Sequence, residues 1–339
     1  MNYLFKSKQK KIILATLFLI VPVVLFFALL WYSIIFVDQK REMWRYPFEK
    51  QPPVSEKIEA ECSRFKGNDV AVILAIGTSN AQNMGTWRFK PESNVYDYNY
   101  KTEKCYVASD PLLGAGGSGG SVWTRLGDKL VRHNDYKNVL IVQMDGPYQT
   151  KDSGWSTKTK LFEIIDATQK KFSEEGIKIT HIVFAQGEHD AGVHNGPITP
   201  AETYKENSKK MIADVRRIGI SAPMYFSVST YCNFFQSEMI RETQRSLADN
   251  PSVFVGAETD KLLGKWYRWD NCHFSGLGLE RASQMWYSAI TGRTPTLKFA
   301  GDLIDPLFKA YLVSFDVLNV IDESIIAFKA NKYKQSFEL

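Results

Sequence analysis

The sequence predicts an α/β protein with three layers, in which helices cover both faces of a parallel sheet, preceded by one transmembrane helix. The first observation behind this prediction is an uncharged run of 26 residues, from Ile12 to Val37. The second is the alternation, from residue 58 onward, of five short apolar segments with amphipathic segments of helical length, which is typical of βαβ units. The third is that three of the apolar segments end in polar turns that contain glycine.

The run from Ile12 to Val37 is long enough to cross a hydrocarbon core of about 30 Å. It exceeds the apolar stretch of a cleavable signal peptide, and no small-x-small site follows it, so we expect an uncleaved signal anchor. A cytoplasmic N-terminus (residues 1–11) is the simpler orientation, because it puts nearly all of the chain on the other side of the membrane. The expected single-pass protein therefore has its folded part outside the cytoplasm.

The net charge of +5 does not indicate nucleic-acid binding. Residues 1–45 hold seven of the 42 basic and two of the 37 acidic residues, which leaves 35 of each beyond residue 45. Because the folded part is electrically balanced, a nucleic-acid partner is not expected.

The remaining elements follow in chain order. Residues 38–57 are polar and contain prolines, which indicates a linker. The folded domain is expected at 58–293. Its predicted strands are 70–76, 139–144, 179–185, 224–228 and 253–255, and its predicted helices are 121–133, 158–175, 200–218, 235–248 and 277–291. Residues 294–339 form a predicted helical extension, which packs on this domain, on the membrane or on a partner.

Ser79 is the candidate nucleophile. It follows the apolar strand Val70–Ile76 in the turn Gly77-Thr78-Ser79-Asn80, at the carboxyl end of a strand, where open α/β sheets bind their ligands. The alternative is that this turn is only a helix cap.

His273 is the candidate base that activates Ser79, and Asp270 is the candidate acid that orients it. A carboxylate three residues before a histidine can hold the imidazole in the tautomer that accepts a proton, although a surface turn would have the same spacing. Gln186 ends the third strand, and its amide can donate to an oxyanion. The Gly146 N–H, after the second strand, can join it. Alternatively, Gln186, Glu188 and Asp190 only satisfy loop backbone groups.

Three other features carry weaker signals. Gly116-Gly117-Ser118-Gly119-Gly120 matches the G-x-S-x-G nucleophile motif, but no strand is predicted before it, and a flexible loop that lines the cleft fits better. The group formed by Glu188, His189, Asp190 and His194 lacks the spacing of a metal site, so no metal is expected. The four cysteines permit the disulfides Cys62–Cys105 and Cys232–Cys272, each of which would tie a loop near the site, or they remain reduced.

Together, these pieces resemble the SGNH hydrolase superfamily, in particular its sialate O-acetylesterase-like carbohydrate esterase branch. The residues that carry the resemblance are Gly77-Thr78-Ser79-Asn80, Gly146, Gln186-Gly187-Glu188-His189-Asp190 and Asp270-Asn271-Cys272-His273. The resemblance covers residues 69–292 and implies a flavodoxin-like sheet. It also implies the nucleophile Ser79, the base His273, the orienting acid Asp270, and oxyanion donors on Ser79, Gly146 and Gln186. Thr78 and the Asp145-Gly146-Pro147-Tyr148 turn depart from the usual residues of the branch, and Gly120 is the substitute donor.

The expected activity is removal of O-acetyl groups from a glycan or envelope polysaccharide through an acyl-enzyme on Ser79, without a cofactor. We expect Asn80, Glu188, Asp190 and Trp155 to contact the substrate. Further aromatic residues that could stack on sugar rings are Trp87, Trp123, Tyr148 and Trp269. One alternative is an O-acetyltransferase that works with a multi-spanning acyltransferase at a bacterial inner membrane, facing the periplasm or the cell exterior. Another is a glycan-binding protein without catalysis.

Overall fold

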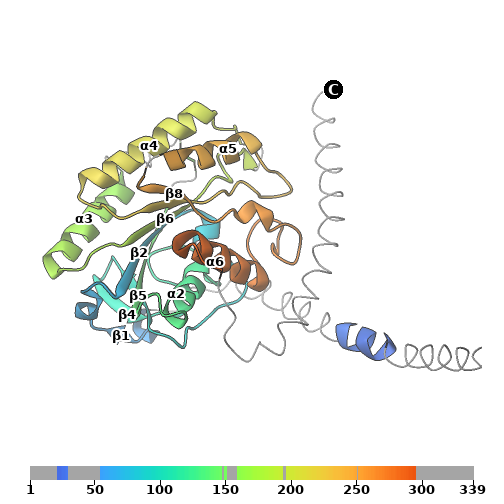
Figure 1. Cartoon of the computed structure of the whole chain (residues 1–339), viewed down its shortest axis with the longest axis horizontal. Coiled ribbons are helices and arrows are strands. Elements are labelled where there is room, and N and C mark those ends of the chain that lie inside the picture. The colour runs from blue at the N-terminus through green and yellow to red at the C-terminus, as the bar shows by residue number, and fades with distance from the viewer. Residues whose placement is uncertain are drawn as a thin grey trace, which may run out of the picture. The chain divides into compact units, whose positions relative to one another are not determined.

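The computed structural model describes residues 21–29, 54–146, 149–150, 159–193, 196–249 and 251–294. In the part from residue 54 onward, an eight-stranded sheet has the order β1-β4-β3-β5-β2-β6-β7-β8 (Figure 1). The strands are Glu59–Ala60 (β1), Val70–Gly77 (β2), Val95–Asn99 (β3), Lys104–Val107 (β4), Asn138–Asp145 (β5), His181–Ala185 (β6), Met224–Phe226 (β7) and Val253–Val255 (β8).

The five predicted strands are confirmed, and they form one parallel block in the order β5-β2-β6-β7-β8. If these five strands are numbered 1 to 5 in chain order, beginning with β2, their order in the sheet is the flavodoxin-like 2-1-3-4-5. The chain reverses its direction of winding at β2, which lies between β5 and β6. The end of β2 is therefore the place where such a sheet binds its ligand.

The sheet continues beyond β5 through three strands that the sequence pattern did not predict. Strand β3 is parallel to β5, whereas β4 is antiparallel to β3, and β1 is antiparallel to β4. Strand β3 was missed because the polar residues Asp97 and Asn99 interrupt its apolar pattern. Both are buried, and the Leu113 N–H donates to Asp97 while the Lys101 N–H donates to Asn99.

All five predicted helices are present, with small changes in their bounds. They are Val122–Arg132 (α2), Lys160–Glu175 (α3), Ala201–Arg217 (α4), Glu238–Ser246 (α5) and Gly276–Thr291 (α6). Helix α5 begins later than expected because the hydroxyl of Ser237 accepts from the Ile240 N–H and caps it. Ser121 and Ser275 cap α2 and α6 in the same way.

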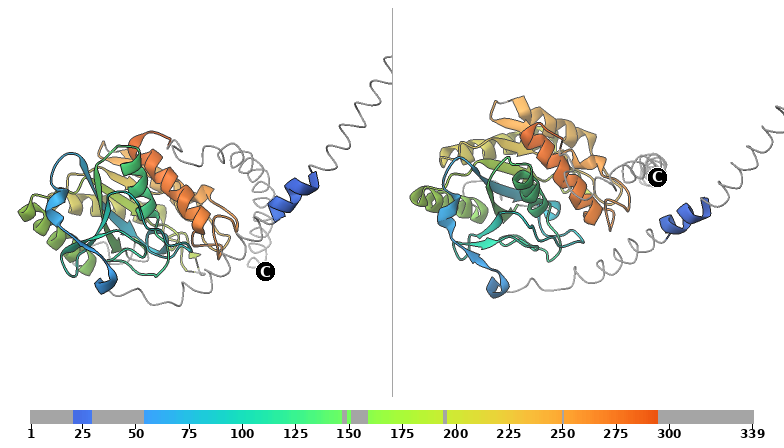
Figure 2. Two further views of the ribbon diagram at one scale, coloured as in Figure 1. Left: turned by 90° about the horizontal axis from the view of Figure 1, so that it is seen from below. Right: turned by 60° about the horizontal axis from the view of Figure 1, so that its bottom comes forward.

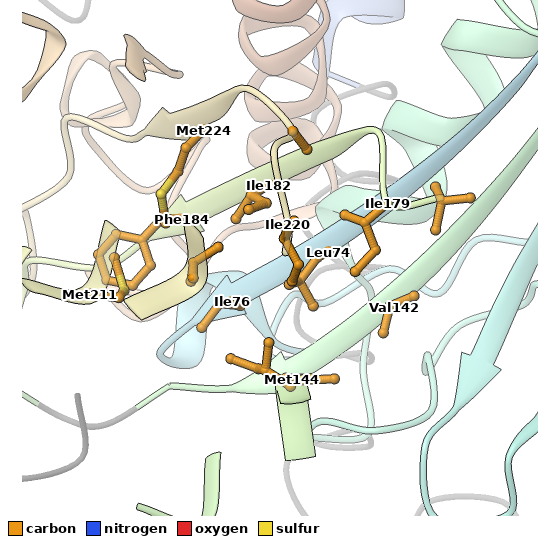
Figure 3. Packing of buried hydrophobic residues seen from close by; sticks show 14 of the residues in the cluster. Leu74, Ile76, Val142, Met144, Ile179, Ile182, Phe184, Met211, Ile220 and Met224 are labelled. Atoms are coloured by element: carbon orange, nitrogen blue, oxygen red, sulfur yellow. The ribbon is translucent and has the colours of Figure 1, made fainter. Parts of the chain in front are cut away.

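Alternate residues of β2 contribute to two hydrophobic cores. Val72, Leu74 and Ile76 join the core that also contains residues of α3, α4 and α5. Figure 3 shows Leu74 and Ile76 in this core together with Met211 of α4. Ala71 and Ile73 join the core that contains residues of α2 and α6, which lie side by side (Figure 2). Because both faces of β2 are buried, its sequence is continuously apolar.

Both of the preferred disulfide pairings are confirmed. Cys62 is bonded to Cys105 of β4, and Cys232 is bonded to Cys272, with Cα–Cα distances of 5.4 and 4.1 Å. The alternative of four reduced cysteines is therefore wrong. The second bond links the residue just before His273 to the loop that follows β7.

Several predicted segments lie wholly or partly outside the described residues. Of the expected membrane span at 12–37, residues 21–29 are described and are helical. Within the described residues, no helix has both the length and the apolar character needed to span a membrane. The extension at 294–339 lies outside them except for its first residue, as do Tyr148 and Trp155. The predicted domain boundaries stay predictions.

Candidate active site

Ser79 lies in a tight turn directly after β2. A Cβ atom at Gly77 would lie 2.0 Å from the Ala185 carbonyl oxygen, so only glycine fits where the chain leaves the sheet. Ser79 is the first residue of a short 3₁₀ helix, Ser79–Ala81, in which the Ala81 N–H donates to Thr78 O at 2.7 Å. The turn places Ser79, partly exposed, at the predicted carboxyl end of β2.

The Asp270–His273 loop has the geometry of a histidine base with its orienting acid. His273 Nδ1 lies 2.6 Å from Asp270 Oδ2. Asp270 Oδ1 accepts from the N–H groups of Cys272 and His273, at 2.9 and 2.6 Å. Burial alone would raise the pKa of Asp270, but these hydrogen bonds and the proximity of His273 together lower it below its usual value. An ionised Asp270 keeps the proton of a neutral imidazole on Nδ1, so that Nε2 can accept one.

Hydrogen bonds join the segment after Ser79 to the segment that contains His273. Asn80 Nδ2 donates to Cys272 O at 3.3 Å, and the Thr86 N–H donates to Phe274 O at 3.2 Å. The indole N–H of Trp269, whose ring stacks on His273, donates to Met84 O at 3.2 Å. These contacts place Ser79 in one of two adjoining loops and Asp270 and His273 in the other.

Arg268 positions the histidine loop, and the sequence did not indicate this role. Its buried guanidinium donates to three backbone carbonyls, those of Cys272 at 2.6 Å, Thr259 at 2.9 Å and Leu262 at 3.0 Å. The guanidinium also lies 4.1 Å from the centre of the Phe274 ring. An arginine next to Trp-Asp has no signature that separates it from a surface arginine, so only the three-dimensional contacts could identify it.

Asn80 and Glu188, which were expected to contact substrate, are buried and contact each other. Asn80 Nδ2 donates to Glu188 Oε1 at 2.8 Å, in addition to its bond to Cys272 O. Burial raises the pKa of Glu188, and the hydrogen bond from Asn80 only partly offsets this effect. The structure therefore gives this pair a positioning role, in contrast to the prediction, because it joins the turns after β2 and β6 to the histidine loop.

Asp190 is also a structural residue, contrary to the prediction that it contacts substrate. It is fully buried, and it accepts hydrogen bonds from the Thr150 N–H, the Thr150 hydroxyl and the Thr199 hydroxyl. Burial raises the pKa of Asp190, which these hydrogen bonds partly offset. The carboxylate therefore holds together the loops around Thr150 and Thr199.

Glu188 and Asp190 have different partners, and no group of three or more potential metal ligands occurs among the described residues.

The expected oxyanion donors differ in their availability. The Gly146 N–H donates to Gly77 O at 2.7 Å, because the β2–β5 ladder extends one residue beyond β5. The N–H of Gly120, the substitute donor, also has an acceptor, because it donates to Gly85 O at 2.8 Å. Neither glycine is therefore an open donor in this conformation, contrary to the prediction.

The two other expected donors lie close to the end of β2. The Ser79 N–H is at the first position of a 3₁₀ helix, where no intrahelical acceptor exists. The Gln186 side chain is buried beside Gly146, since a Cβ atom at Gly146 would lie 3.2 Å from Gln186 Oε1. Gln186 Nε2 lies 3.5 Å from Asp190 Oδ2.

The glycine-rich loop 114–120 is folded around Asn83 and is not an open loop of the cleft. Asn83 Nδ2 donates to Leu112 O at 2.9 Å and to Gly116 O at 3.1 Å. Residues 108–117 contain no strand, and Ser118 is buried, so the nucleophile motif lacks its required context, as expected. Trp123 is also buried, against Trp286, and is not a sugar contact.

Comparison with known proteins gives similarity at the level of fold. No protein-family model matches the chain, and no curated protein matches it in sequence. A crystal structure of a protein from Arabidopsis thaliana has a TM-score of 0.54 and 18% identity, over 67% of this chain and 99% of that one. NanS has a TM-score of 0.44 and 13% identity, over 67% of this chain and 98% of its own.

A carbohydrate acetylesterase from Xanthomonas citri has a TM-score of 0.41 and 14% identity, over 66% of this chain and 57% of that one. Of these three, the Arabidopsis protein has the highest TM-score. At such identities the likeness to it concerns the fold alone. This chain therefore shares the α/β fold of that protein.

Proposed function

We propose that this protein is an SGNH-type serine esterase that removes O-acetyl groups from a glycan or an envelope polysaccharide. The observation that carries the proposal is the 2.6 Å contact between Asp270 Oδ2 and His273 Nδ1, in a loop that is hydrogen-bonded to the residue after Ser79. An esterase needs this arrangement, since a serine hydroxyl is a weak nucleophile without a neighbouring base. The order of the parallel strands supports the assignment to this superfamily.

In the proposed reaction, Ser79 Oγ attacks the acetyl carbonyl carbon while His273 Nε2 takes the hydroxyl proton. The oxyanion is stabilised by the Ser79 N–H and the Gln186 amide. His273 then gives the proton to the sugar oxygen as the ester bond breaks, which leaves acetyl-Ser79. A water molecule, deprotonated by His273, then attacks the carbonyl carbon of this acyl-enzyme, and His273 returns the proton to Ser79 Oγ as the acyl bond breaks and acetate leaves. Asp270 stays ionised and stabilises the imidazolium in both steps.

We further propose that residues 12–37 anchor the protein in a bacterial inner membrane, with the catalytic domain outside the cytoplasm. Their uncharged length supports this part of the proposal. An enzyme anchored there would meet polysaccharides of the cell envelope. If a sugar hydroxyl discharged the acyl-enzyme in place of water, the same site would act as an O-acetyltransferase.

The test is hydrolysis of 4-nitrophenyl acetate by the full-length protein in detergent, with mass spectrometry for an acetyl group on Ser79. Ser79→Ala is expected to lower kcat by at least about 10³-fold and to abolish the adduct. Ser118→Ala, which changes the serine of the look-alike motif, is the matched control and should retain activity. Equal activity of the wild type and Ser79→Ala would refute the proposal. Supplying an acceptor oligosaccharide distinguishes hydrolysis from transfer, because transfer yields acetylated oligosaccharide and hydrolysis yields acetate.

A further inference from the structure

Two polar side chains lie beside the Ser79 turn, on the side of β5. Asp145 is the last residue of β5 and pairs with Gly77 in the β2–β5 ladder. Gln82 follows the turn, and its N–H donates to Ser79 O at 3.1 Å. A Cβ atom at Gly116 would lie 3.2 Å from Gln82 Oε1 and 3.9 Å from each carboxylate oxygen of Asp145. Both side chains therefore border the same space, which Gly116 leaves open because it has no side chain.

These two side chains have hydrogen-bonding capacity that the described part of the protein does not use. Asp145 is exposed, whereas residues 139–144 of the same strand are buried. Its Oδ1 accepts from the Gly116 N–H at 2.8 Å, but its Oδ2 has no hydrogen-bond partner among the described residues. The side-chain amide of Gln82, which is partly exposed, has none among them either. Polar groups with unused capacity at the carboxyl edge of a parallel sheet are typical of a ligand site.

The loop around Gly116 holds this space in one shape. Gly116 O accepts from Asn83 Nδ2 at 3.1 Å and from the Asn83 N–H at 3.0 Å. The Tyr100 ring packs on the same loop, since a Cβ atom at Gly114 would lie 3.1 Å from it. Burial and the nearby carboxylate of Asp145 raise the pKa of Tyr100, so its hydroxyl keeps its proton and can donate. The space is therefore bounded by a folded loop, with a third polar group near Asp145.

The charge of this site restricts the ligands that it can take. An ionised Asp145 only accepts hydrogen bonds, whereas the amide of Gln82 both donates and accepts, which suits neighbouring sugar hydroxyls. Lys101 acts to lower the pKa of Asp145, but burial outweighs it and the pKa remains raised. The surroundings of Asp145 therefore disfavour negative charge, and an acidic sugar would bring a second one.

We propose that Gln82 and Asp145 bind hydroxyl groups of the sugar that carries the ester, and that this subsite selects uncharged sugars over acidic ones. This inference rests on the proposed function and names its substrate class, an O-acetylated neutral glycan. A site that hydrogen-bonds substrate hydroxyls rejects a ligand without them, because its own polar groups are then left unpaired. Repulsion between like charges adds to the discrimination against an acidic sugar.

The experiment compares the full-length wild type with Gln82→Ala, Gly116→Ala and Asp145→Asn. The substrates are chemically O-acetylated cello-oligosaccharides, which are neutral, O-acetylated oligogalacturonides, which are acidic, and 4-nitrophenyl acetate, which has no sugar. Gln82→Ala removes the amide and Gly116→Ala fills the space. Each should lower the ratio of kcat/KM for the neutral oligosaccharides to that for 4-nitrophenyl acetate about tenfold. The wild type should prefer the neutral to the acidic oligosaccharides, and Asp145→Asn, which removes only the charge, should reduce this preference about tenfold.

Asp69→Asn is the matched control, because it changes an exposed aspartate that directly precedes β2, at the opposite end of that strand. It should leave both ratios unchanged. A wild type without preference for the neutral oligosaccharides, including one that hydrolyses only 4-nitrophenyl acetate, would overturn the inference while the proposed function stands. Unchanged ratios in Gln82→Ala or in Asp145→Asn would do the same. No hydrolysis of any of the three esters by the wild type would instead overturn the proposed function, and this inference with it.

Discussion

Replacing Asn80 by alanine tests whether the bond between Asn80 and Glu188 holds the site together. In the native protein, Asn80 Nδ2 donates to Glu188 Oε1 at 2.8 Å and to Cys272 O at 3.3 Å. Cys272 O keeps its shorter bond from Arg268 Nη1, so most of the loss concerns Glu188. Glu188 Oε2 has no hydrogen-bond partner among the described residues. Asn80→Ala therefore removes the side-chain donor of a buried carboxyl group whose other oxygen is already without one.

The expected cost is about 2–3 kcal/mol of unfolding free energy, the contribution of a hydrogen bond to a charged group. This is a large share of a typical stability of about 5–15 kcal/mol. The cost depends on pH. Burial raises the pKa of Glu188 above its unfolded value, so ionisation of this group lowers stability as the pH rises through the folded pKa. Asn80 stabilises the ionised form, and its removal should therefore cost more at pH 8 than at pH 4.

The assay is urea unfolding of the two single variants and the double variant of Asn80→Ala and Glu188→Gln, at both pH values. Glu188→Gln keeps an acceptor but removes the charge, so Asn80→Ala should cost about 1–2 kcal/mol less in that background at pH 8. Steady-state kinetics should show a lower kcat for Asn80→Ala, because the histidine loop loses a contact to the turn of Ser79. Additive effects at pH 8, or a cost of Asn80→Ala below about 0.5 kcal/mol at both pH values, would refute the reasoning.

Two other predictions concern the disulfides and a buried acid. Removing the Cys232–Cys272 bond with two serines should lower both Tm and kcat, since it frees the histidine loop, whereas the same change at Cys62–Cys105 should lower Tm by a similar amount and leave kcat unchanged. Equal kcat in the two variants would contradict this. Burial raises the pKa of Asp97 to about 7, so the folded protein holds a proton that the unfolded chain releases near pH 4. Stability should therefore fall as the pH rises from 4 to 7, and Asp97→Asn should flatten the dependence of Tm on pH; an unchanged slope would contradict this.

The sequence was sufficient for the central part of the fold because that part follows simple rules. Strand β2 is buried on both faces, and a continuously apolar segment of this length is typical of such a strand. Strand β3 breaks the rule, since Asp97 lies in its middle and accepts a hydrogen bond from the Leu113 N–H, a partner outside the strand. Polar residues inside a strand become intelligible only when their partners are known.

The same limit applies to the site. The pairing of Asp270 with His273 is local, so the spacing of three residues was enough to predict it. The burial of Asn80 and Asp190 depends on loops distant in sequence, and a polar residue in a motif looks alike whether it faces substrate or a neighbouring loop. The Gly146 N–H was misjudged for a related reason, because the sequence does not show how far a β-ladder extends.

Arg268 shows why the positioning residues matter for the chemistry. Its guanidinium is fully buried, and desolvation lowers its pKa, an effect that the nearby acids Asp260 and Glu188 oppose. A charge is kept in such a place only if its hydrogen bonds offset the cost of burial, and three backbone carbonyls supply them. Those carbonyls belong to Thr259, Leu262 and Cys272, so one guanidinium joins three points of the backbone. The buried charge thus fixes the path of the backbone through Cys272, on which the position of His273 depends.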